Sequence, residues 1–204
     1  RSLSQQIKNM ITNFSYEFIG DSPNWEKLHV IHSWGTDSET GIYSEYANKC
    51  NFTALNYNGA VAKYGRDNAF NGACSELLNQ TIKFDPYYDA ILIDEAQDMP
   101  ISFFKLCYRI SKDPKRVIFA YDELQNLSNA TMPSVEEMFG KDSYGNPLVR
   151  LINNKNEARQ DITLPICYRN TPWALTLAHS IGFGIYRKEG IVQLFNDLDL
   201  WEDI

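Results

Sequence analysis

The sequence predicts an α/β fold with a parallel sheet, and three consecutive segments in the middle of the chain carry this prediction. Residues 88–93 form an apolar stretch interrupted only by Asp89, residues 101–110 have the spacing of an amphipathic helix, and residues 116–120 are apolar again. Strand, helix and strand in this order form a βαβ unit, whose strands run parallel with a right-handed crossover. Because parallel strands are normally covered on both faces, we expect both strands to be buried.

Two helices and one strand are predicted before this unit. Residues 3–19 repeat apolar side chains at three- and four-residue spacing, which is typical of an amphipathic helix, and Gly20 follows as an end signal. Residues 28–32 are a short strand candidate. Residues 67–82 favour a second helix, within a Gly-, Asn- and Tyr-rich stretch, 36–85, that we interpret as an insertion between core strands.

The segments after the βαβ unit are less regular. Asp113-Pro114 predicts a turn, and residues 128–160 are rich in loop-forming residues. Residues 162–166 are predicted as a further strand. A helix over residues 172–181 is expected to follow, with Pro172 in its first turn.

Composition narrows the class of protein. The 204 residues are 44% hydrophobic, enough for one full core or two incomplete ones, and no apolar run is long enough to span a membrane. The four cysteines include no C-x-x-C pair, which argues against a zinc site or a disulfide framework and fits a reducing cytoplasm. The net charge of −7 argues against a nucleic-acid-binding surface over the whole chain, although a local track remains compatible with it.

Two acids, Asp94 and Glu95, directly follow the predicted strand 88–93. In open α/β sheets the ligand crevice lies beyond the carboxyl ends of the strands, and acids there are costly to bury unless a cation neutralises them. Mg²⁺ carrying nucleotide phosphates would do so through one or two carboxylates. We assign Asp94 as the metal ligand and Glu95 as the residue that orients and deprotonates a water. The alternative is a surface turn with ordinary charges.

Polar residues also follow the second predicted strand, in the segment 119–125 with the sequence FAYDELQ. Neighbouring strands lie about 4.8 Å apart. Gln125 can therefore reach the same crevice as Glu95 if the two strands are adjacent or one apart. Otherwise Gln125 is an ordinary polar surface residue.

A third polar segment, 164–170 with the sequence LPICYRN, contains Tyr168 and Arg169. A guanidinium is always charged and stabilises negative charge on a transferred phosphoryl group, and an aromatic face suits a planar base. The alternative interpretation is a common surface pair at a strand end.

The order and spacing of these segments resemble those of superfamily I DNA helicases of the UvrD/Rep type. The string DEAQD at residues 94–98 resembles their Walker B motif, residues 119–125 resemble motif III, and residues 164–170 resemble motif IV. Two motifs differ from the family pattern: Ala120-Tyr121 replaces the first Gly of motif III, and Cys167 replaces the usual Asn of motif IV. No clear match to the base-stacking aromatic residue of motif III lies in 126–133.

The resemblance implies a RecA-like P-loop NTPase core and ATP-dependent DNA helicase activity with 3′-to-5′ movement. Mg²⁺-ATP is then expected between two RecA-like domains, with Asp94 and Gln97 in the ATP site. The same resemblance implies that Gln125 and Arg169 contact the γ-phosphate and that Tyr168 packs on adenine. Glu95 and Arg169 are the expected catalytic residues.

Two N-terminal segments resemble DNA-contacting parts of the same family. Arg1-Ser2-Leu3 resembles motif Ia, and His32-Ser33-Trp34 resembles the next DNA-facing segment. Ser2, His32 and Trp34 are therefore the expected DNA contacts, with Trp34 able to stack on a base. Alternatively, Trp34 is a core residue.

The loop that grips phosphates in this family, G-x-x-x-x-G-K-S/T, is absent from the sequence. Since the chain begins with Arg1, we expect it to be an internal piece of a longer protein, with that loop upstream. Residues 1–35 and 86–155 are interpreted as a partial first motor domain, 36–85 as an inserted subdomain, and 156–204 as the start of the second. We expect no ATP turnover from this chain alone, and self-association through exposed strand edges.

Two other functions stay open. The chain could be a non-catalytic scaffold or binding module derived from a helicase fold. It could also be a metal-dependent nuclease that uses Asp94, Glu95 and Asp98, although no E-x-K string accompanies these acids.

Overall fold

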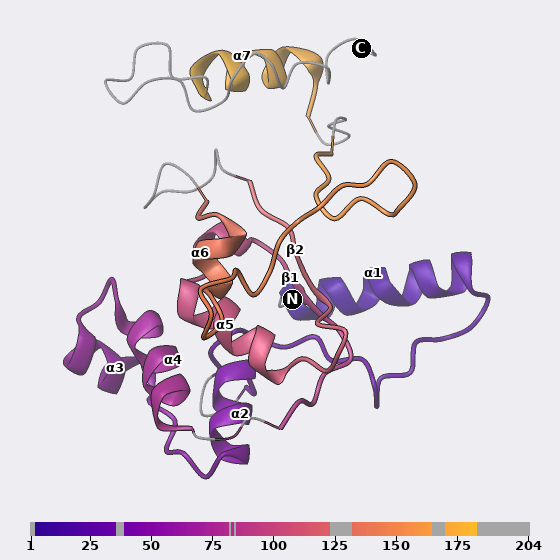
Figure 1. Ribbon diagram of the computed structural model, residues 1–204. Coiled ribbons are helices and arrows are strands. Elements are labelled where there is room, and N and C mark those ends of the chain that lie inside the picture. Colours follow the sequence, from indigo (N-terminus) through magenta and orange to yellow (C-terminus); the bar gives the residue numbers. More distant parts are fainter. Residues whose placement is uncertain are drawn as a thin grey trace. The chain divides into compact units, whose positions relative to one another are not determined.

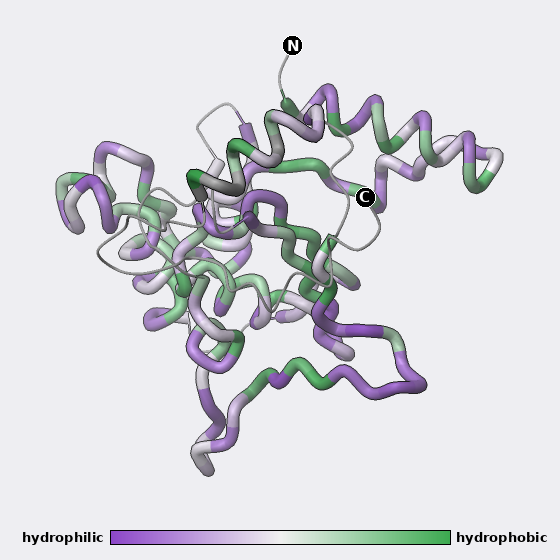
Figure 2. Tube along the Cα trace, turned by 90° about the horizontal axis from the view of Figure 1, so that it is seen from above, coloured by the Kyte–Doolittle hydropathy of each residue, from purple (hydrophilic) through white to green (hydrophobic). Residues whose placement is uncertain are grey.

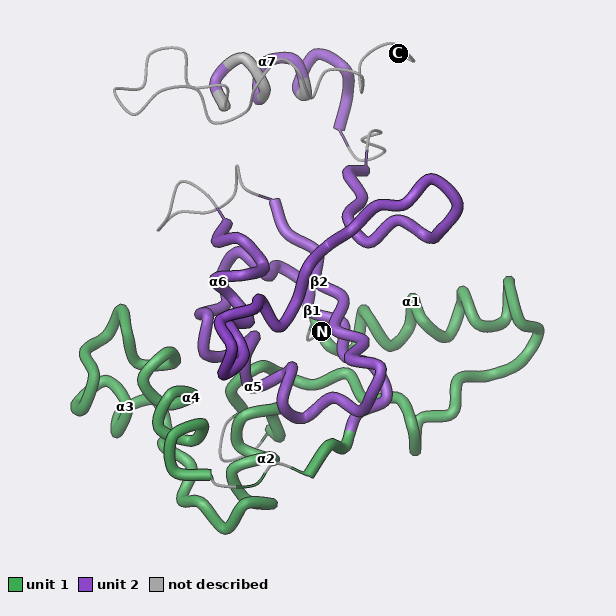
Figure 3. Tube along the Cα trace, in the orientation of Figure 1, with its two compact units in different colours: residues 1–87 green, residues 88–204 purple. Residues whose placement is uncertain are grey.

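The computed structural model describes residues 3–35, 39–81, 83, 85–122, 132–164 and 170–182 (Figure 1). The chain divides into two compact units, Arg1–Tyr87 and Tyr88–Ile204 (Figure 3). The predicted domain boundaries after residues 35, 85 and 155 stay a prediction.

Unit 1 is helical over its described residues. It contains α1 (Leu3–Phe18), α2 (Ile42–Lys49), α3 (Tyr57–Tyr64) and α4 (Ala69–Gln80). The predicted helices 3–19 and 67–82 are thus confirmed as α1 and α4, each slightly shorter than expected. The side chains buried in the core of this unit come from α2, α3 and α4: Tyr43, Tyr46, Ala47, Ala60, Ala69, Ala73, Cys74 and Leu77.

The prediction of a strand at residues 28–32 is wrong. Only His32 takes part in strand-like pairing, as an isolated parallel bridge to Gly41. The carbonyl oxygens of His32, Ser33 and Trp34 instead accept hydrogen bonds of 2.9, 3.0 and 3.2 Å from the first backbone N–H groups of α2. The first N–H groups of a helix have no partner within the helix, so residues 32–34 act as its cap rather than as a strand.

Helix α1 leaves its apolar side chains largely uncovered. None of its described residues is buried, and Leu3, Met10, Phe14 and Phe18 are all at least half exposed. Figure 2 shows hydrophobic and hydrophilic stretches alternating along this helix, next to the N label. The helix is therefore amphipathic as predicted, but its stability cannot come from a buried apolar stripe.

Unit 2 contains the predicted βαβ order. Strand β1 (Ile91–Ile93) is followed by α5 (Ile101–Ile110) and by β2 (Val117–Phe119). The strands pair in parallel, with Leu92 opposite Ile118. Tyr88 adds an isolated parallel bridge to Ser111, so the regular strand is shorter than the predicted 88–93. The mixed α/β class with a small parallel sheet is thus confirmed.

Helix α5 covers one face of this strand pair. Ile91 and Ile93 are buried, and the ring of Phe104 meets that of Phe119 edge-on, with the ring centroids 5.6 Å apart. On the other face Leu92 and Ile118 are 74% and 59% exposed. The expectation that both strands are buried is therefore wrong, because the described residues supply a cover for one face only.

The last described elements are α6 (Val135–Phe139) and α7 (Pro172–Gly182). A capping box between Ser134 and Glu137 begins α6, which packs Phe139 against Phe104 of α5. The predicted helix 172–181 is confirmed as α7. The predicted strand 162–166 is not formed over residues 162–164, and residues 165–166 lie outside the described part. Within the described residues, no helix combines the length and apolar character needed to cross a membrane.

Candidate functional site

The two acids Asp94 and Glu95 lie at the carboxyl end of the parallel strand pair, and both are exposed. Backbone pairing continues past the strand ends: the N–H of Ala120 donates to the carbonyl oxygen of Ile93, and the N–H of Ala96 donates to the carbonyl oxygen of Ala120, both at 2.9 Å. The chain after β1 therefore stays alongside the chain after β2. This is the edge at which α/β sheets bind ligands.

Glu95 has an unusual backbone conformation. Its φ of 48° and ψ of 46° lie in the left-handed region. This region costs a non-glycine residue about 1–2 kcal/mol, and such residues cluster at functional sites. The turn redirects the chain from β1 into the short 3-10 helix η1 (Ala96–Asp98), and the side chain of Asp94 accepts a hydrogen bond of 3.1 Å from the N–H of Glu95.

Gln97 joins this turn to the segment that follows β2. Its Nε2 donates a hydrogen bond of 2.6 Å to Oε2 of Glu95, and its Oε1 accepts one of 3.1 Å from the backbone N–H of Asp122. Gln97 itself is only 7% exposed. A buried amide thus connects an exposed carboxylate to the neighbouring loop. The contact made by Asp122 could not be predicted from the sequence, because a backbone N–H group leaves no signal in the residue types.

The structure brings together Asp94, Glu95 and Gln97 from the predicted ATP site. Gln125, Tyr168, Arg169 and the predicted DNA contact Ser2 lie outside the described residues. Their assignments stay predictions.

The donor chemistry of Asp94 fits a magnesium ion, because Mg²⁺ prefers oxygen ligands and commonly uses one or two carboxylates with several waters. The exposed carboxylate of Asp94 supplies one such ligand. Among the described residues, no three His, Cys, Asp or Glu side chains are grouped so that they could hold a metal ion by themselves. A magnesium ion at Asp94 would therefore depend on waters and phosphate oxygens for its other ligands.

The predicted DNA contacts His32 and Trp34 have partners within unit 1. His32 pairs with the carboxylate of Glu39 at 2.9 Å, and both side chains are exposed. The indole N–H of Trp34 donates to the carbonyl oxygen of Leu55 at 3.0 Å, and its ring stacks on Phe70 with the centroids 4.8 Å apart. Trp34 therefore has a packing role, and DNA binding by either residue stays a prediction.

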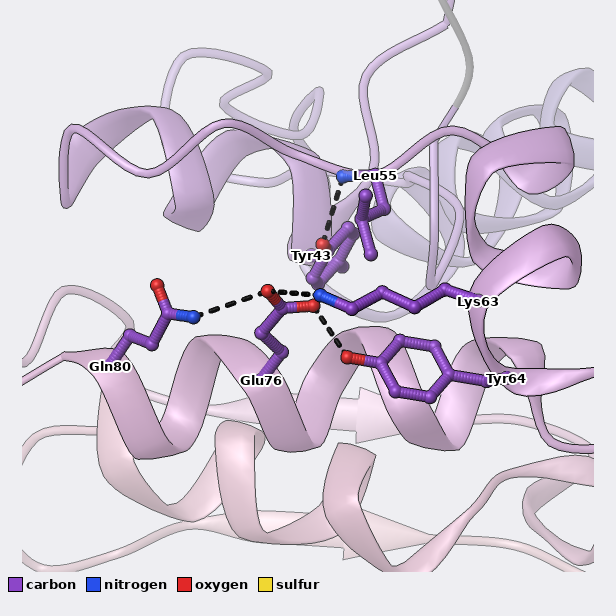
Figure 4. Close-up of polar contacts among 6 residues, drawn as sticks. All are labelled: Tyr43, Leu55, Lys63, Tyr64, Glu76 and Gln80. Atoms are coloured by element: carbon purple, nitrogen blue, oxygen red, sulfur yellow. Dashed lines mark hydrogen bonds and ion pairs between the residues drawn. The ribbon is translucent and has the colours of Figure 1, made fainter.

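A polar cluster between α3 and α4 was not predicted (Figure 4). The carboxylate of Glu76 accepts hydrogen bonds from Lys63 Nζ at 2.8 Å, Tyr64 OH at 2.6 Å and Gln80 Nε2 at 3.2 Å. The bonds from Lys63 and then Tyr64 lower the pKa of Glu76 below its usual value. All three donors point at one half-buried acid, so the cluster ties the two helices together.

Comparison with known proteins gives no match: no family model, no curated protein and no solved structure matches this chain. Fold and site together define a mixed α/β protein whose parallel strand pair carries two exposed acids at its carboxyl end.

Proposed function

We propose that this chain is part of an ATP-dependent DNA helicase or translocase of the UvrD/Rep type, built on a RecA-like core. One observation supports the proposal most. Asp94 and Glu95 directly follow the parallel strand β1, and the chain at this point lies alongside the chain that follows β2. Three polar segments in the helicase order accompany this arrangement in the sequence. A nucleotide site needs acids and phosphate-sensing groups on one such edge.

In the proposed reaction, the metal-binding, water-activating and nucleotide-contacting roles fall to different side chains. Asp94 holds a magnesium ion that neutralises phosphate charge. Glu95 orients the attacking water and accepts its proton. Gln125 and Arg169 contact the γ-phosphate, since a guanidinium keeps its charge at all physiological pH values. Tyr168 packs on adenine.

The proposed DNA contacts are Ser2, His32 and Trp34, on single-stranded DNA or a duplex junction. The cytoplasm is the proposed location. The sequence contains no G-x-x-x-x-G-K-S/T string, so tight binding of Mg²⁺-ATP requires this loop from elsewhere in the intact protein. By itself the chain is expected to be inactive as an ATPase.

The test is DNA-stimulated ATP hydrolysis by the protein that the whole reading frame around this chain encodes. A general base contributes about 10²–10⁴-fold, so Glu95→Gln should lower kcat by at least about 100-fold. Glu136→Gln, at an exposed acid in α6, is the matched control and should leave kcat unchanged. Equal hydrolysis by the native protein and Glu95→Gln would refute the proposed role.

The second candidate is a non-catalytic scaffold or binding module derived from a helicase fold. The missing phosphate-gripping string favours it. The reading frame upstream of Arg1 separates the two candidates. A G-K-S/T loop in that region supports the motor, whereas a start codon immediately before Arg1 supports the scaffold.

A further inference from the structure

We propose that Gln97 is a positioning residue, which holds the carboxylate of Glu95 in register with the segment after β2, rather than a direct ligand of ATP. This inference rests on the proposed function, because it assigns a role in the same site. The amide of Gln97 makes two hydrogen bonds that carry the inference. It contacts Glu95 on one side and the backbone of Asp122 on the other.

The chemistry of the two contacts requires an amide. The carboxylate of Glu95 needs a donor, and the N–H of Asp122 needs an acceptor. A glutamine side chain offers both at its tip, whereas a glutamate lacks the donor and a lysine lacks the acceptor. With 7% of its surface exposed, Gln97 has little area left for a nucleotide.

The bonds around Gln97 form a closed connection between the two strand ends. The backbone bond from Ala96 to Ala120 fixes the start of the turn, and the amide of Gln97 fixes its far side. Glu95, in its left-handed conformation, lies between them. Any displacement of residue 122 therefore moves the amide of Gln97, and with it the carboxylate of Glu95. A change in the segment after β2 would in this way reach the residue that orients water.

Exchanging the two side chains tests the pairing. In Gln97→Glu two carboxylates face each other and repel, so residue 97 should move away from both partners. The backbone amide signal of Glu95 in a ¹⁵N-labelled chain should then shift, and amide exchange at Asp122 should become faster. In the double variant Glu95→Gln with Gln97→Glu, the amide of residue 95 donates to residue 97, which still accepts from Asp122. Amide exchange at Asp122 should then return to its native rate.

A packing variant separates this role from a merely structural one. Gln97→Met keeps the volume and loses both bonds, and a typical hydrogen bond of about 0.5–1.5 kcal/mol corresponds to about 2- to 10-fold faster exchange at Asp122. Gln80→Met, at a glutamine that donates to Glu76, is the control and should leave Asp122 unchanged. Native exchange at Asp122 in a folded Gln97→Met chain, or no recovery in a folded double variant, overturns the pairing.

In the intact protein the kinetic readout distinguishes positioning from ATP binding. Gln97→Met should lower kcat about 10-fold or more with KM for ATP unchanged, whereas an ATP ligand would raise KM. A raised KM with native kcat overturns the positioning role. The exchange experiments need no nucleotide. If they succeed while Glu95→Gln leaves ATP hydrolysis intact, the proposed function fails and the Gln97 link remains.

Discussion

Gln97 accepts a hydrogen bond of 3.1 Å from the backbone N–H of Asp122, across 25 positions of sequence. The contact lies just beyond the last paired residues of β1 and β2, and it adds to the backbone bonds of Ile93 and Ala96 with Ala120. The carboxyl ends of the two strands therefore form one continuous edge, and Asp94 and Glu95 belong to it.

Because the backbone at Glu95 is left-handed, we expect the glycine variant at this position to be more stable than the alanine variant, which is the reverse of the order found in helices. Glycine adopts a φ of 48° freely, whereas alanine is strained there, so Glu95→Gly should be more stable than Glu95→Ala by about 1 kcal/mol. Both variants lose the bond from Gln97, so the difference isolates the backbone. Urea unfolding measures it.

Lys105, in the interior of α5, supplies the control. There alanine should be more stable than glycine by about 1 kcal/mol, because glycine disfavours a helix. The same order at both positions would show that residue 95 is not in the left-handed region.

The open sheet face predicts that Leu92→Lys leaves folding almost unchanged and reduces self-association. Leu92 is 74% exposed and lies opposite the exposed Ile118, so its replacement should change the free energy of unfolding by less than about 0.5 kcal/mol. Charged residues blunt exposed apolar strands, so the association expected of the native chain should weaken. Sedimentation velocity over a range of concentrations measures the association.

The adjacent buried residue Ile93 is the comparison for Leu92. Ile93→Ala should cost about 2–5 kcal/mol, because it removes buried apolar atoms and leaves a cavity. If Leu92→Lys destabilised the chain as much as Ile93→Ala does, this face of the sheet would have to be covered.

The cluster around Glu76 predicts a loss of stability in acid. The pKa of Glu76 is lowered in the folded chain, chiefly by Lys63 and next by Tyr64. Its contribution is therefore complete above the unfolded pKa of about 4.3 and is lost as pH falls through the lower folded pKa. Glu76→Gln should reduce stability at neutral pH and flatten its pH dependence below about pH 4.3. Urea unfolding across this range, followed by a probe in unit 1, tests it.

Variants of the three hydrogen-bond donors measure how much each one contributes to the lowered pKa of Glu76. Lys63→Met and Tyr64→Phe should flatten the pH dependence more than Gln80→Met does, because the bond from Gln80 affects the pKa of Glu76 least. A Gln80→Met chain with the flattest profile would contradict the arrangement in Figure 4.

At Gly72, packing against Tyr64 should decide whether substitution by alanine stabilises or destabilises the chain. Within α4, glycine to alanine should gain about 1 kcal/mol from helix propensity. A Cβ at residue 72, however, would lie 2.2 Å from Cγ of Tyr64, and overpacking of this kind costs about 1–3 kcal/mol. Gly72→Ala should therefore be destabilising in the native chain and stabilising in a Tyr64→Ala background. A gain in both backgrounds would mean that Tyr64 does not pack on α4.

Apolar patterns predicted some of the elements that form, whereas helices α2, α3 and α6 were not predicted. Helices α1, α4, α5 and α7 and the parallel pairing of β1 with β2 follow from spacing along the chain. The strand predicted at residues 28–32 failed because an apolar run does not show where its carbonyl groups find partners, and here those of residues 32–34 cap α2. The exposure of Leu92 was missed for a related reason: an apolar strand does not reveal whether its second face has a cover.

The candidate site was predictable to the extent that it depends on strand ends. Two acids after an apolar strand predict a ligand-binding edge, and Asp94 and Glu95 do lie at the carboxyl end of a parallel strand pair. The left-handed turn at Glu95 was not predictable, because glutamate has no preference for it. The link from Gln97 to Asp122 depends on strand register and a backbone group, neither of which the residue types encode.

The most direct test of the shared edge is paramagnetic broadening by Mn²⁺, which takes the same oxygen ligands as Mg²⁺. In the ¹⁵N-labelled chain, with ATP present to supply the phosphate oxygens, the amide signals of Glu95, Ala96 and Asp122 should broaden together at the lowest Mn²⁺ concentrations, and Asp94→Asn should abolish this. Broadening of the residues after β1 without Asp122, or broadening that persists in Asp94→Asn, would contradict a metal site on the joint edge of β1 and β2.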